Sequence, residues 1–306
     1  RPCSFCLREN ASNCCVSERA RRDAFLIVFR RPRIPQRAAP VSLSPTIDFL
    51  DFNLPPPPAA RWAHRPGDEA AAQRLARRTG VPPLLARILV ARGLNEGEET
   101  DRFLRPSLGQ IHDPNQLKGM AEAIGRLGRA LDAGETVWIY GDYDVDGLTA
   151  MTLLNQTLRE LGGQVDYYIP HRLNEGYGLN GDAIEELAGQ GVRLIVTVDC
   201  GITAVEEAQL ARRLGVDLIV TDHHEPGPEL PTALAVVNPR QPGCLYPFKD
   251  LAGVGVAFKL AHALLKARHP DPERAKTFLK SLLDLVALGT VADVVPLLGE
   301  NRALAA

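Results

Sequence analysis

Short apolar runs alternate with amphipathic stretches from Thr136 onward, and this rhythm predicts alternating strands and helices. Strands are expected at 136–140, 164–169, 193–198, 217–221 and 233–237. Helices are expected at 147–161, 181–190 and 203–214, followed by two longer helices from about 253 and 274. The apolar runs of the strands are nearly continuous, which is typical of a parallel sheet covered on both faces. The predicted fold class is therefore α/β, with a mostly parallel sheet flanked by helices.

The region before this sheet divides into two parts. Residues 1–60 are rich in Arg, Pro and Ser and keep no periodicity for long, so we expect a disordered extension. Residues 61–133 show helical periodicity in stretches that end in Gly or Pro, which predicts a small helical lead-in. The α/β domain is expected at 134–306. Because the chain does not begin with Met and stops without a natural finish, we expect both ends to be truncated.

The composition of the chain excludes several classes of protein. The 306 residues are 45% apolar and 24% charged, with a formal net charge of −2, so a nucleic-acid groove would have to be a local basic patch. No apolar run reaches 18 residues, and no membrane span is expected. Most cysteines lie at the start of the chain, which argues against a disulfide scaffold and fits a reducing bacterial cytoplasm. Those cysteines are Cys3, Cys6, Cys14 and Cys15, and the adjacent last pair is poorly spaced for zinc.

Acidic and imidazole side chains follow three of the predicted strands. Parallel strands end at one edge of a sheet, where open α/β folds bind their ligands. Carboxylates this dense repel one another unless a cation lies among them. An oxygen-rich set with some imidazole favours Mn²⁺ first and Mg²⁺ second, and more than four carboxylates indicate two ions, an arrangement used for phosphoester hydrolysis. The residues concerned are Asp142, Asp144, Asp146, Asp199, Asp222, His223 and His224.

These segments also allow other interpretations. An EF-hand loop needs Glu at its twelfth position, where this chain has Leu153, and a helix where a strand is expected. "GYGLNG" imitates a dinucleotide fingerprint but does not follow its strand directly, which favours a loop that can move over substrate. Residues 251–261 open a helix with small residues, either to offer N–H groups to a phosphate or to allow close packing. A single Asp at a strand end is often a helix cap or a turn former.

The motifs "GDYDVDG", "VTVDCG" and "VTDHH", in this order, resemble the DHH phosphoesterase family. A fourth motif follows in "LVALGTVADVVPL", where Asp293 matches the last metal-ligand position. The segments "YYIPHRLNEGYGLN", "VVNPRQPGCLYPF" and "LAGVGVAFKLA" are similar to those of the family's bacterial 5′-to-3′ exonucleases specific for single-stranded DNA. The resemblance runs from about Trp62 to Arg302. The family's second domain, with its Gly-Gly-His motif, and an OB-fold are expected to lie beyond this chain.

The resemblance implies a phosphodiesterase that releases mononucleotides from single-stranded DNA in repair and recombination. It implies two divalent cations that activate water, with Mn²⁺ preferred and Mg²⁺ possible. Asp142 and Asp144 would serve the first ion, and Asp199 would bridge both. The second ion would take Asp146, His223 and Asp293. His224 would lie near the scissile phosphate, and Asp222 would orient the histidines. The catalytic set is thus Asp144, Asp146, Asp199, His223 and His224.

Partners and rival functions complete the expectations. Single-stranded DNA is the expected substrate, and the resemblance implies a single-strand-binding protein and a helicase as partners. His171, Arg172 and Arg240 follow strands or lie in later loops, where they are candidates for phosphate contact. One alternative is a phosphodiesterase for short oligonucleotides or cyclic dinucleotides, which the long helical lead-in disfavours. Another is a non-catalytic replication scaffold, which the intact set of acids disfavours.

Overall fold

The computed structural model describes residues 67–171 and 178–306 of the chain. The expected extension at 1–60, its four cysteines, Arg172 and the first part of "GYGLNG" lie outside these ranges. The described residues belong to one compact unit by their contacts, and the predicted domain boundaries within it stay predictions. Among the described helices, none is long and apolar enough to cross a membrane.

Five parallel strands form a single sheet with the order β2-β1-β3-β4-β5. The prediction of a parallel α/β fold is confirmed. In register, Val137 of β1 lies opposite Val165 of β2, and Val198 of β3 lies opposite Thr221 of β4. The strands are β1 (Val137–Gly141), β2 (Val165–Tyr168), β3 (Leu194–Val198), β4 (Asp217–Thr221) and β5 (Ala235–Val237).

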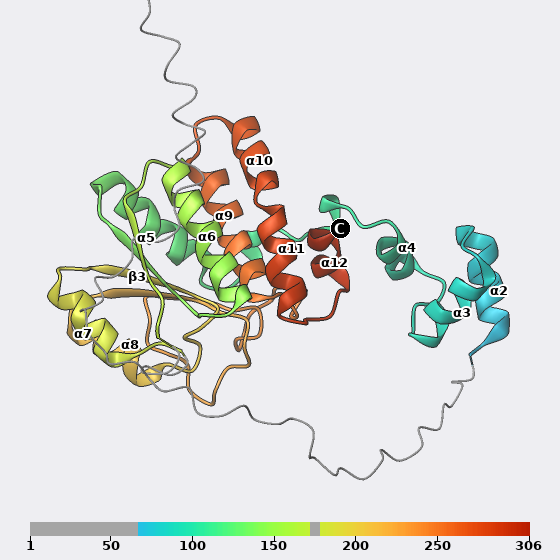
Figure 1. Ribbon diagram of the computed structural model, residues 1–306, viewed down its shortest axis with the longest axis horizontal. Coiled ribbons are helices and arrows are strands. Elements are labelled where there is room, and N and C mark those ends of the chain that lie inside the picture. Colours follow the sequence, from blue (N-terminus) through green and yellow to red (C-terminus); the bar gives the residue numbers. More distant parts are fainter. Residues whose placement is uncertain (1–66, 172–177) are drawn as a thin grey trace, which may run out of the picture. The chain divides into compact units, whose positions relative to one another are not determined.

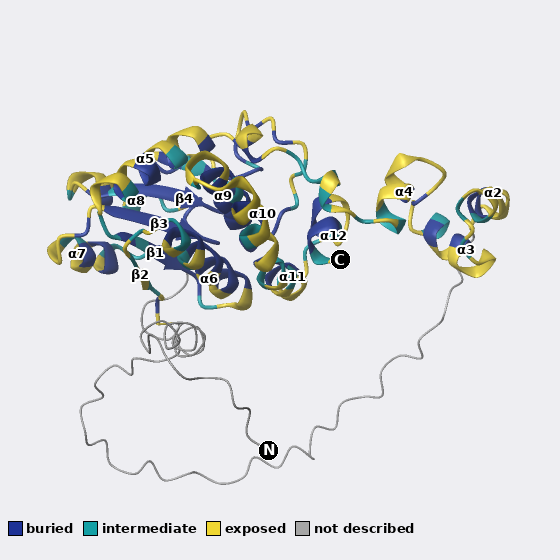
Figure 2. Ribbon diagram, turned by 90° about the horizontal axis from the view of Figure 1, so that it is seen from above, coloured by how far each residue is buried: buried dark blue, intermediate teal, exposed yellow. Residues whose placement is uncertain are grey.

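Helices cover both faces of the sheet (Figure 1). One face packs against α5 (Met120–Ala133), α6 (Val145–Glu160) and α9 (Gly253–Arg268). The other face packs against α7 (Gly181–Gly189) and α8 (Val205–Arg213). Successive side chains of a strand point to opposite faces, so Ile139 belongs to the first layer and Tyr140 to the second. The central strands β3 and β4 are therefore buried on both faces (Figure 2), whereas Asp166 and Tyr167 of the edge strand β2 are exposed.

Three further helices follow α9 along the chain. They are α10 (Pro272–Ser281), α11 (Leu283–Ala292) and α12 (Gly299–Ala305). The sequence pattern predicted a longer helix from about 274; a helix does begin near there, but it ends at Ser281 and further helices follow. Pro296 and Gly299 explain the second interruption, because proline does not continue a helix. No glycine or proline marks the first interruption, at the buried residue Leu282.

The helical lead-in is present as α2 (Glu69–Thr79), α3 (Pro83–Ala91) and α4 (Glu98–Leu104), followed by the 3₁₀ turns Leu108–Gln110 and Pro114–Gln116. Asp68 caps α2 by accepting the Ala71 N–H at 2.9 Å, and Gly80 ends it with φ 75°. A small separate core of Leu75, Ala86 and Leu89 joins α2 and α3.

Candidate metal centre

A tight turn connects β1 to α6 and carries the first three aspartates. Asp144 is the N-cap of α6, and its Oδ1 accepts the Gly147 N–H at 2.9 Å. The helix therefore begins at Val145, two residues before the predicted start, and Asp146 lies in its first turn. A Cβ at position 147 would lie 2.7 Å from the carbonyl oxygen of Asp142, so this turn requires glycine. One short motif thus supplies both a helix cap and a cluster of carboxylates.

Asp146 is buried against the N-terminus of α9. Its Oδ2 accepts the Gly253 N–H at 2.6 Å, and its Oδ1 accepts the Val254 N–H at 2.8 Å. These amides would otherwise have no partner within the helix, and the helix dipole favours an anion at this end. A Cβ on Gly289 of α11 would lie 2.9 Å from Asp146 Oδ1. Within 251–261, a Cβ on Gly253 would collide with Asp199 Oδ1, so this glycine allows close packing, and the first N–H groups of α9 bind a carboxylate of the protein itself.

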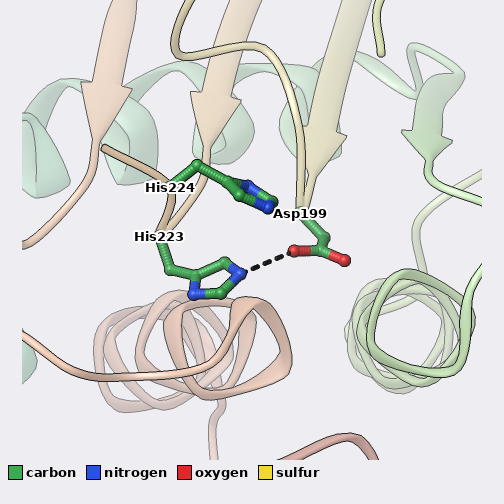
Figure 3. A group of neighbouring side chains, drawn as sticks. All are labelled: Asp199, His223 and His224. Atoms are coloured by element: carbon green, nitrogen blue, oxygen red, sulfur yellow. Dashed lines mark ion pairs between the residues drawn. The ribbon is translucent and has the colours of Figure 1, made fainter. Parts of the chain in front are cut away.

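Asp199 directly follows β3 in a left-handed conformation, with φ 61°. Its N–H still donates to the carbonyl oxygen of Thr221 at 3.0 Å, so the main chain continues the ladder while the side chain turns away. Asp199 Oδ1 lies 3.1 Å from Nε2 of His223, the first residue after Asp222 on the neighbouring strand end (Figure 3). The two atoms are not aligned as a hydrogen bond, and both lack a hydrogen-bond partner among the described residues.

His223 Nε2 is also 3.8 Å from Asp146 Oδ2 and 3.8 Å from Asp293 Oδ2. Asp293 Oδ2, like the His223 and Asp199 atoms, is a buried polar atom without a hydrogen-bond partner in the described residues. Buried polar atoms are nearly always paired, so several unpaired ones facing one another indicate a missing partner. A divalent cation satisfies all of them at once, and carboxylates with one imidazole suit Mn²⁺. The residues present therefore fit a metal ion.

Candidate ligand atoms form overlapping groups in the described part of the chain, each within 4.8 Å. The groups are Asp142 with Asp144 and Asp199, Asp146 with His223 and Asp293, and Asp199 with His223 and His224. The first two groups have the members that the resemblance assigns to its two ions. The assignment of each residue to an ion stays a prediction.

The carboxyl ends of the strands form an edge of the sheet that we call the rim, and it carries Asp142, Asp144, Asp146, Asp199, Asp222, His223 and His224. The electrostatics of this rim also favour a cation. Burial raises the pKa of Asp199 to about 10, and the charges of Asp146 and Asp144 act in the same direction. Burial raises the pKa of Asp146 to about 6, against the opposing effects of the Val254 N–H and of His223. Without a cation, Asp199 holds a proton at neutral pH, and a bound ion would replace it.

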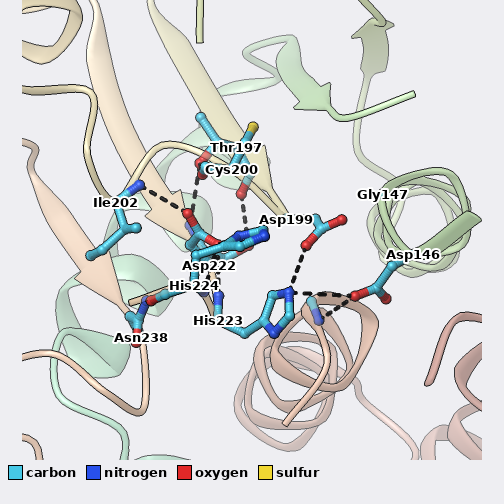
Figure 4. Close-up of polar contacts among 12 residues, drawn as sticks. Asp146, Gly147, Thr197, Asp199, Cys200, Ile202, Asp222, His223, His224 and Asn238 are labelled. Carbon is cyan, nitrogen blue, oxygen red and sulfur yellow. Dashed lines mark hydrogen bonds and ion pairs between the residues drawn. The ribbon is translucent and has the colours of Figure 1, made fainter. Parts of the chain in front are cut away.

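Asp222 lies behind the two histidines and organises them. Its Oδ1 is 2.7 Å from Nδ1 of His224 and also accepts the N–H of His223 at 2.7 Å (Figure 4). Its Oδ2 accepts the Ile202 N–H at 2.9 Å. The hydrogen bond to Asp222 raises the pKa of His224 to about 9. Burial alone would raise the pKa of Asp222, but its hydrogen bonds, with His224 first, outweigh burial and lower it. Asp222 therefore fixes the orientation of His224.

Asn238 belongs to this region although the sequence pattern did not single it out. It follows β5 and is fully buried. Its Nδ2 donates to the carbonyl oxygen of His224 at 3.0 Å, and its Oδ1 accepts the Arg240 N–H at 2.7 Å. The available signal was a polar residue at one more strand end, in "AVVN".

The three residues predicted to contact DNA differ in their surroundings. The Arg240 guanidinium bonds to Glu225 at 3.0 Å and to Asp250 at 2.7 Å, so a phosphate would compete with two carboxylates. His171 is exposed beyond β2, and Arg172 lies outside the described residues. These contacts stay predictions.

Comparisons with known proteins agree with this geometry. The model of the DHH family, N-terminal domain, matches residues 136–290. The single-stranded-DNA-specific exonuclease RecJ of Bacillus subtilis is 49% identical over 245 residues, which are 80% of this chain and 30% of that protein. RecJ from Thermus thermophilus in complex with Mn²⁺ is 35% identical with a TM-score of 0.62, over 78% of this chain and 32% of the other. The Mg²⁺ complex of the same protein is 31% identical with a TM-score of 0.51, over 78% and 29%.

The match includes the turn after β1 and the ends of β3 and β4, which carry the candidate ligands other than Asp293, and it ends three residues before Asp293. The chain spans less than a third of the length of its Bacillus subtilis relative. On the family match and the identity to RecJ, this chain belongs to the DHH family.

Proposed function

We propose that this chain is the metal-binding part of a 5′-to-3′ exonuclease that hydrolyses single-stranded DNA to mononucleotides. The observation that carries the proposal is the group of buried, unpaired ligand atoms on Asp199, His223 and Asp293. The identity to RecJ, an exonuclease named for its specificity for single-stranded DNA, supports the substrate class. The RecJ complexes with Mn²⁺ and Mg²⁺ support a divalent ion.

Two groups of side chains would hold the ions. Asp142 and Asp144 would bind one ion and Asp146, His223 and Asp293 the other, with Asp199 shared between them. When bound, divalent ions lower the pKa of water and neutralise negative charge on phosphate oxygens.

The protein contributes rigidity and a further positive charge. Two N–H groups at the N-terminus of α9 donate to the two carboxylate oxygens of Asp146, and these bonds fix the orientation of the side chain. Asp222 holds the His224 ring at its Nδ1 and favours the charged imidazole. A charged His224 would stabilise the negative charge that develops on the scissile phosphate. Water, as the nucleophile, needs no serine or cysteine from the chain.

A test compares a 5′-labelled single-stranded oligonucleotide with a dinucleotide, each with Mn²⁺ and with EDTA. The variants are Asp199→Asn, which keeps the side-chain shape, and Asp217→Asn as a control at the opposite end of β4. Cleavage of the oligonucleotide that requires Mn²⁺, is lost in Asp199→Asn and is retained in Asp217→Asn is the expected result.

Three other outcomes would contradict the proposal. Cleavage of the dinucleotide alone would favour the phosphodiesterase for short substrates. Cleavage that is unaffected by EDTA or by Asp199→Asn would place the activity elsewhere. Binding of Mn²⁺ without cleavage of either substrate would contradict hydrolysis by this chain alone and limit its role to metal binding.

A further inference from the structure

The turn after β3 holds its aspartate in a conformation that must be stabilised by its surroundings. In the described part of the chain, the residues other than glycine with positive φ are Asp199 and Val294. Aspartate visits the left-handed region more easily than most residues, but the conformation remains unfavourable and persists only when neighbouring contacts impose it. Gly201, two residues after Asp199, has φ 104° and adds freedom rather than restraint. The restraint must therefore come from other groups.

Thr197, two residues before Asp199, supplies a hydrogen bond across this turn. Its Oγ1 donates to the carbonyl oxygen of Cys200 at 2.7 Å, so the bond encloses the backbone of Asp199 (Figure 4). The same Oγ1 accepts the Thr221 N–H at 3.3 Å, and the Thr221 hydroxyl donates to the Thr197 carbonyl oxygen at 2.6 Å. Thr197 and Thr221 have no exposed surface. The turn is thus tied to the ends of both β3 and β4.

The Asp199 carboxylate is closely surrounded by other groups. A Cβ on Gly253 of α9 would collide with Asp199 Oδ1, so the helix is already in close contact with this side chain. On its other side, Oδ1 is 3.1 Å from His223 Nε2. A change in the backbone at Asp199 would therefore move its carboxylate out of the two candidate groups that contain it.

We propose that Thr197 is a positioning residue whose hydroxyl holds the strained Asp199 turn, and thereby holds the Asp199 carboxylate where it can bind divalent cations. The proposal rests on the proposed metal-binding function. A buried valine would fill the same space in a strand but would remove the hydrogen bonds to the Cys200 carbonyl oxygen and from the Thr221 N–H, so the hydroxyl contributes through these bonds. Thr197 acts through Asp199 and does not itself touch metal or substrate.

The experiment measures Mn²⁺ affinity and stoichiometry by isothermal titration on the full 306-residue chain, together with unfolding in urea. Thr197→Val removes the hydroxyl and keeps the branched shape, and Thr197→Ser restores it. Thr157→Val is the matched control, because Thr157 is equally buried and donates to the Leu153 carbonyl oxygen at 2.9 Å within α6, away from the rim.

Thr197→Val is expected to bind Mn²⁺ about tenfold more weakly, equivalent to about 1.4 kcal/mol. Thr197→Ser and Thr157→Val are expected to bind as the wild type does, even where Thr157→Val unfolds more easily. If Thr197→Val does not fold, Thr197→Ala against Thr197→Ser isolates the hydroxyl in the same way.

Two results would overturn the proposal, and they differ. Equal Mn²⁺ affinity in Thr197→Val and wild type, or an equal loss in Thr157→Val, would remove the role of Thr197 and leave the proposed function standing. A wild-type chain that binds no Mn²⁺ would overturn the proposed function and this role with it.

Discussion

Single aspartates at the rim differ in what surrounds their oxygens, and this decides their charge. Asp222 accepts several hydrogen bonds and keeps a lowered pKa. Asp146 accepts two N–H groups, yet burial still raises its pKa to about 6. Asp199 Oδ1 accepts no hydrogen bond from the described residues, and burial raises the pKa of Asp199 to about 10. Asp199 is therefore the carboxylate that gains most from a cation.

Asp222→Asn is expected to lower the rate of DNA hydrolysis about 10- to 100-fold, the usual effect of removing a partner behind an active group. A carboxylate accepts at both oxygens, whereas the amide presents an NH₂ group to either Ile202 N–H or His224. Mn²⁺ affinity should change less than the rate. The measurement is initial rate beside titration with Mn²⁺, with Asp217→Asn as control. Equal rates in wild type and Asp222→Asn would contradict this role.

Lys259 illustrates a buried charge with a structural role. Its Nζ lies 2.6 Å from Glu300 Oε1, and both side chains are fully buried. Burial lowers the pKa of Lys259, and Glu300 opposes this effect. Lys259→Met is expected to lower the free energy of unfolding by about 3–5 kcal/mol, because it leaves the Glu300 carboxylate buried without its partner.

Urea denaturation measures this loss against Lys266→Met, which removes an exposed lysine from the same helix. The control should change stability by less than about 0.5 kcal/mol. A similar small loss in both variants would show that the buried pair contributes little.

The sequence could predict which residues gather at the rim, but not how each is held. These residues were predicted to lie together because they follow strands, and the pattern of apolar runs shows where each strand ends. The donors to Asp146 come from Gly253 and Val254, 107 and 108 residues later, and no local pattern encodes such a contact. The left-handed backbone of Asp199 was also not predictable, because an aspartate after a strand is common in ordinary turns.

At the level of elements, glycines allow α6, α9 and α11 to meet around Asp146. A Cβ on Gly289 of α11 would collide with Thr149 Oγ1 of α6 and lie 2.8 Å from Val254 Cγ1 of α9. The sequence left close packing as one of two explanations for the small residues at 251–261. The sequence could not distinguish phosphate binding from close packing, because the residues of a helix do not show which other elements it contacts.

Gly289→Ala is expected to cost about 1–3 kcal/mol of stability, as overpacking does, and to weaken Mn²⁺ binding by displacing Asp146. Gly255→Ala is the control, because its Cβ would meet the Leu251 side chain at 3.3 Å, which can move aside. The measurements are urea unfolding and Mn²⁺ titration. An equal response of both variants would mean that the approach of α11 does not position Asp146.

At the level of the whole molecule, the strand order explains why the site lies where it does. In the order β2-β1-β3-β4-β5, the connections reverse direction between β1 and β3, and open sheets bind ligands at such a reversal. Asp142 and Asp144 follow β1, and Asp199 follows β3, so they flank this point. Apolar runs predicted a parallel sheet but not its order, because the side chains of a strand do not identify the strands on either side of it.

The pKa of Asp199 predicts a pH dependence for the whole chain. With a pKa of 3.8 unfolded and about 10 folded, the folded chain holds one more proton between these values. The stability of the metal-free wild type relative to Asp199→Asn is therefore highest below about pH 4 and falls as pH rises toward 10. Because bound Mn²⁺ would replace this proton, the melting temperature gained from Mn²⁺ should grow from about pH 5 to about pH 8.

Thermal unfolding of wild type and Asp199→Asn, each in EDTA and in Mn²⁺ at both pH values, measures this dependence. A gain from Mn²⁺ that is the same at the two pH values would show that no proton leaves the rim when the ion binds.

The central claim is that the rim of this sheet binds divalent cations through the side chains named above. Anomalous diffraction from crystals soaked in Mn²⁺ tests it most directly, because it places the ions without reference to activity. We predict two peaks, one among Asp142, Asp144 and Asp199 and one among Asp146, His223 and Asp293. Crystals that show no peak at the rim, or that bind Mn²⁺ only elsewhere on the chain, would contradict the claim.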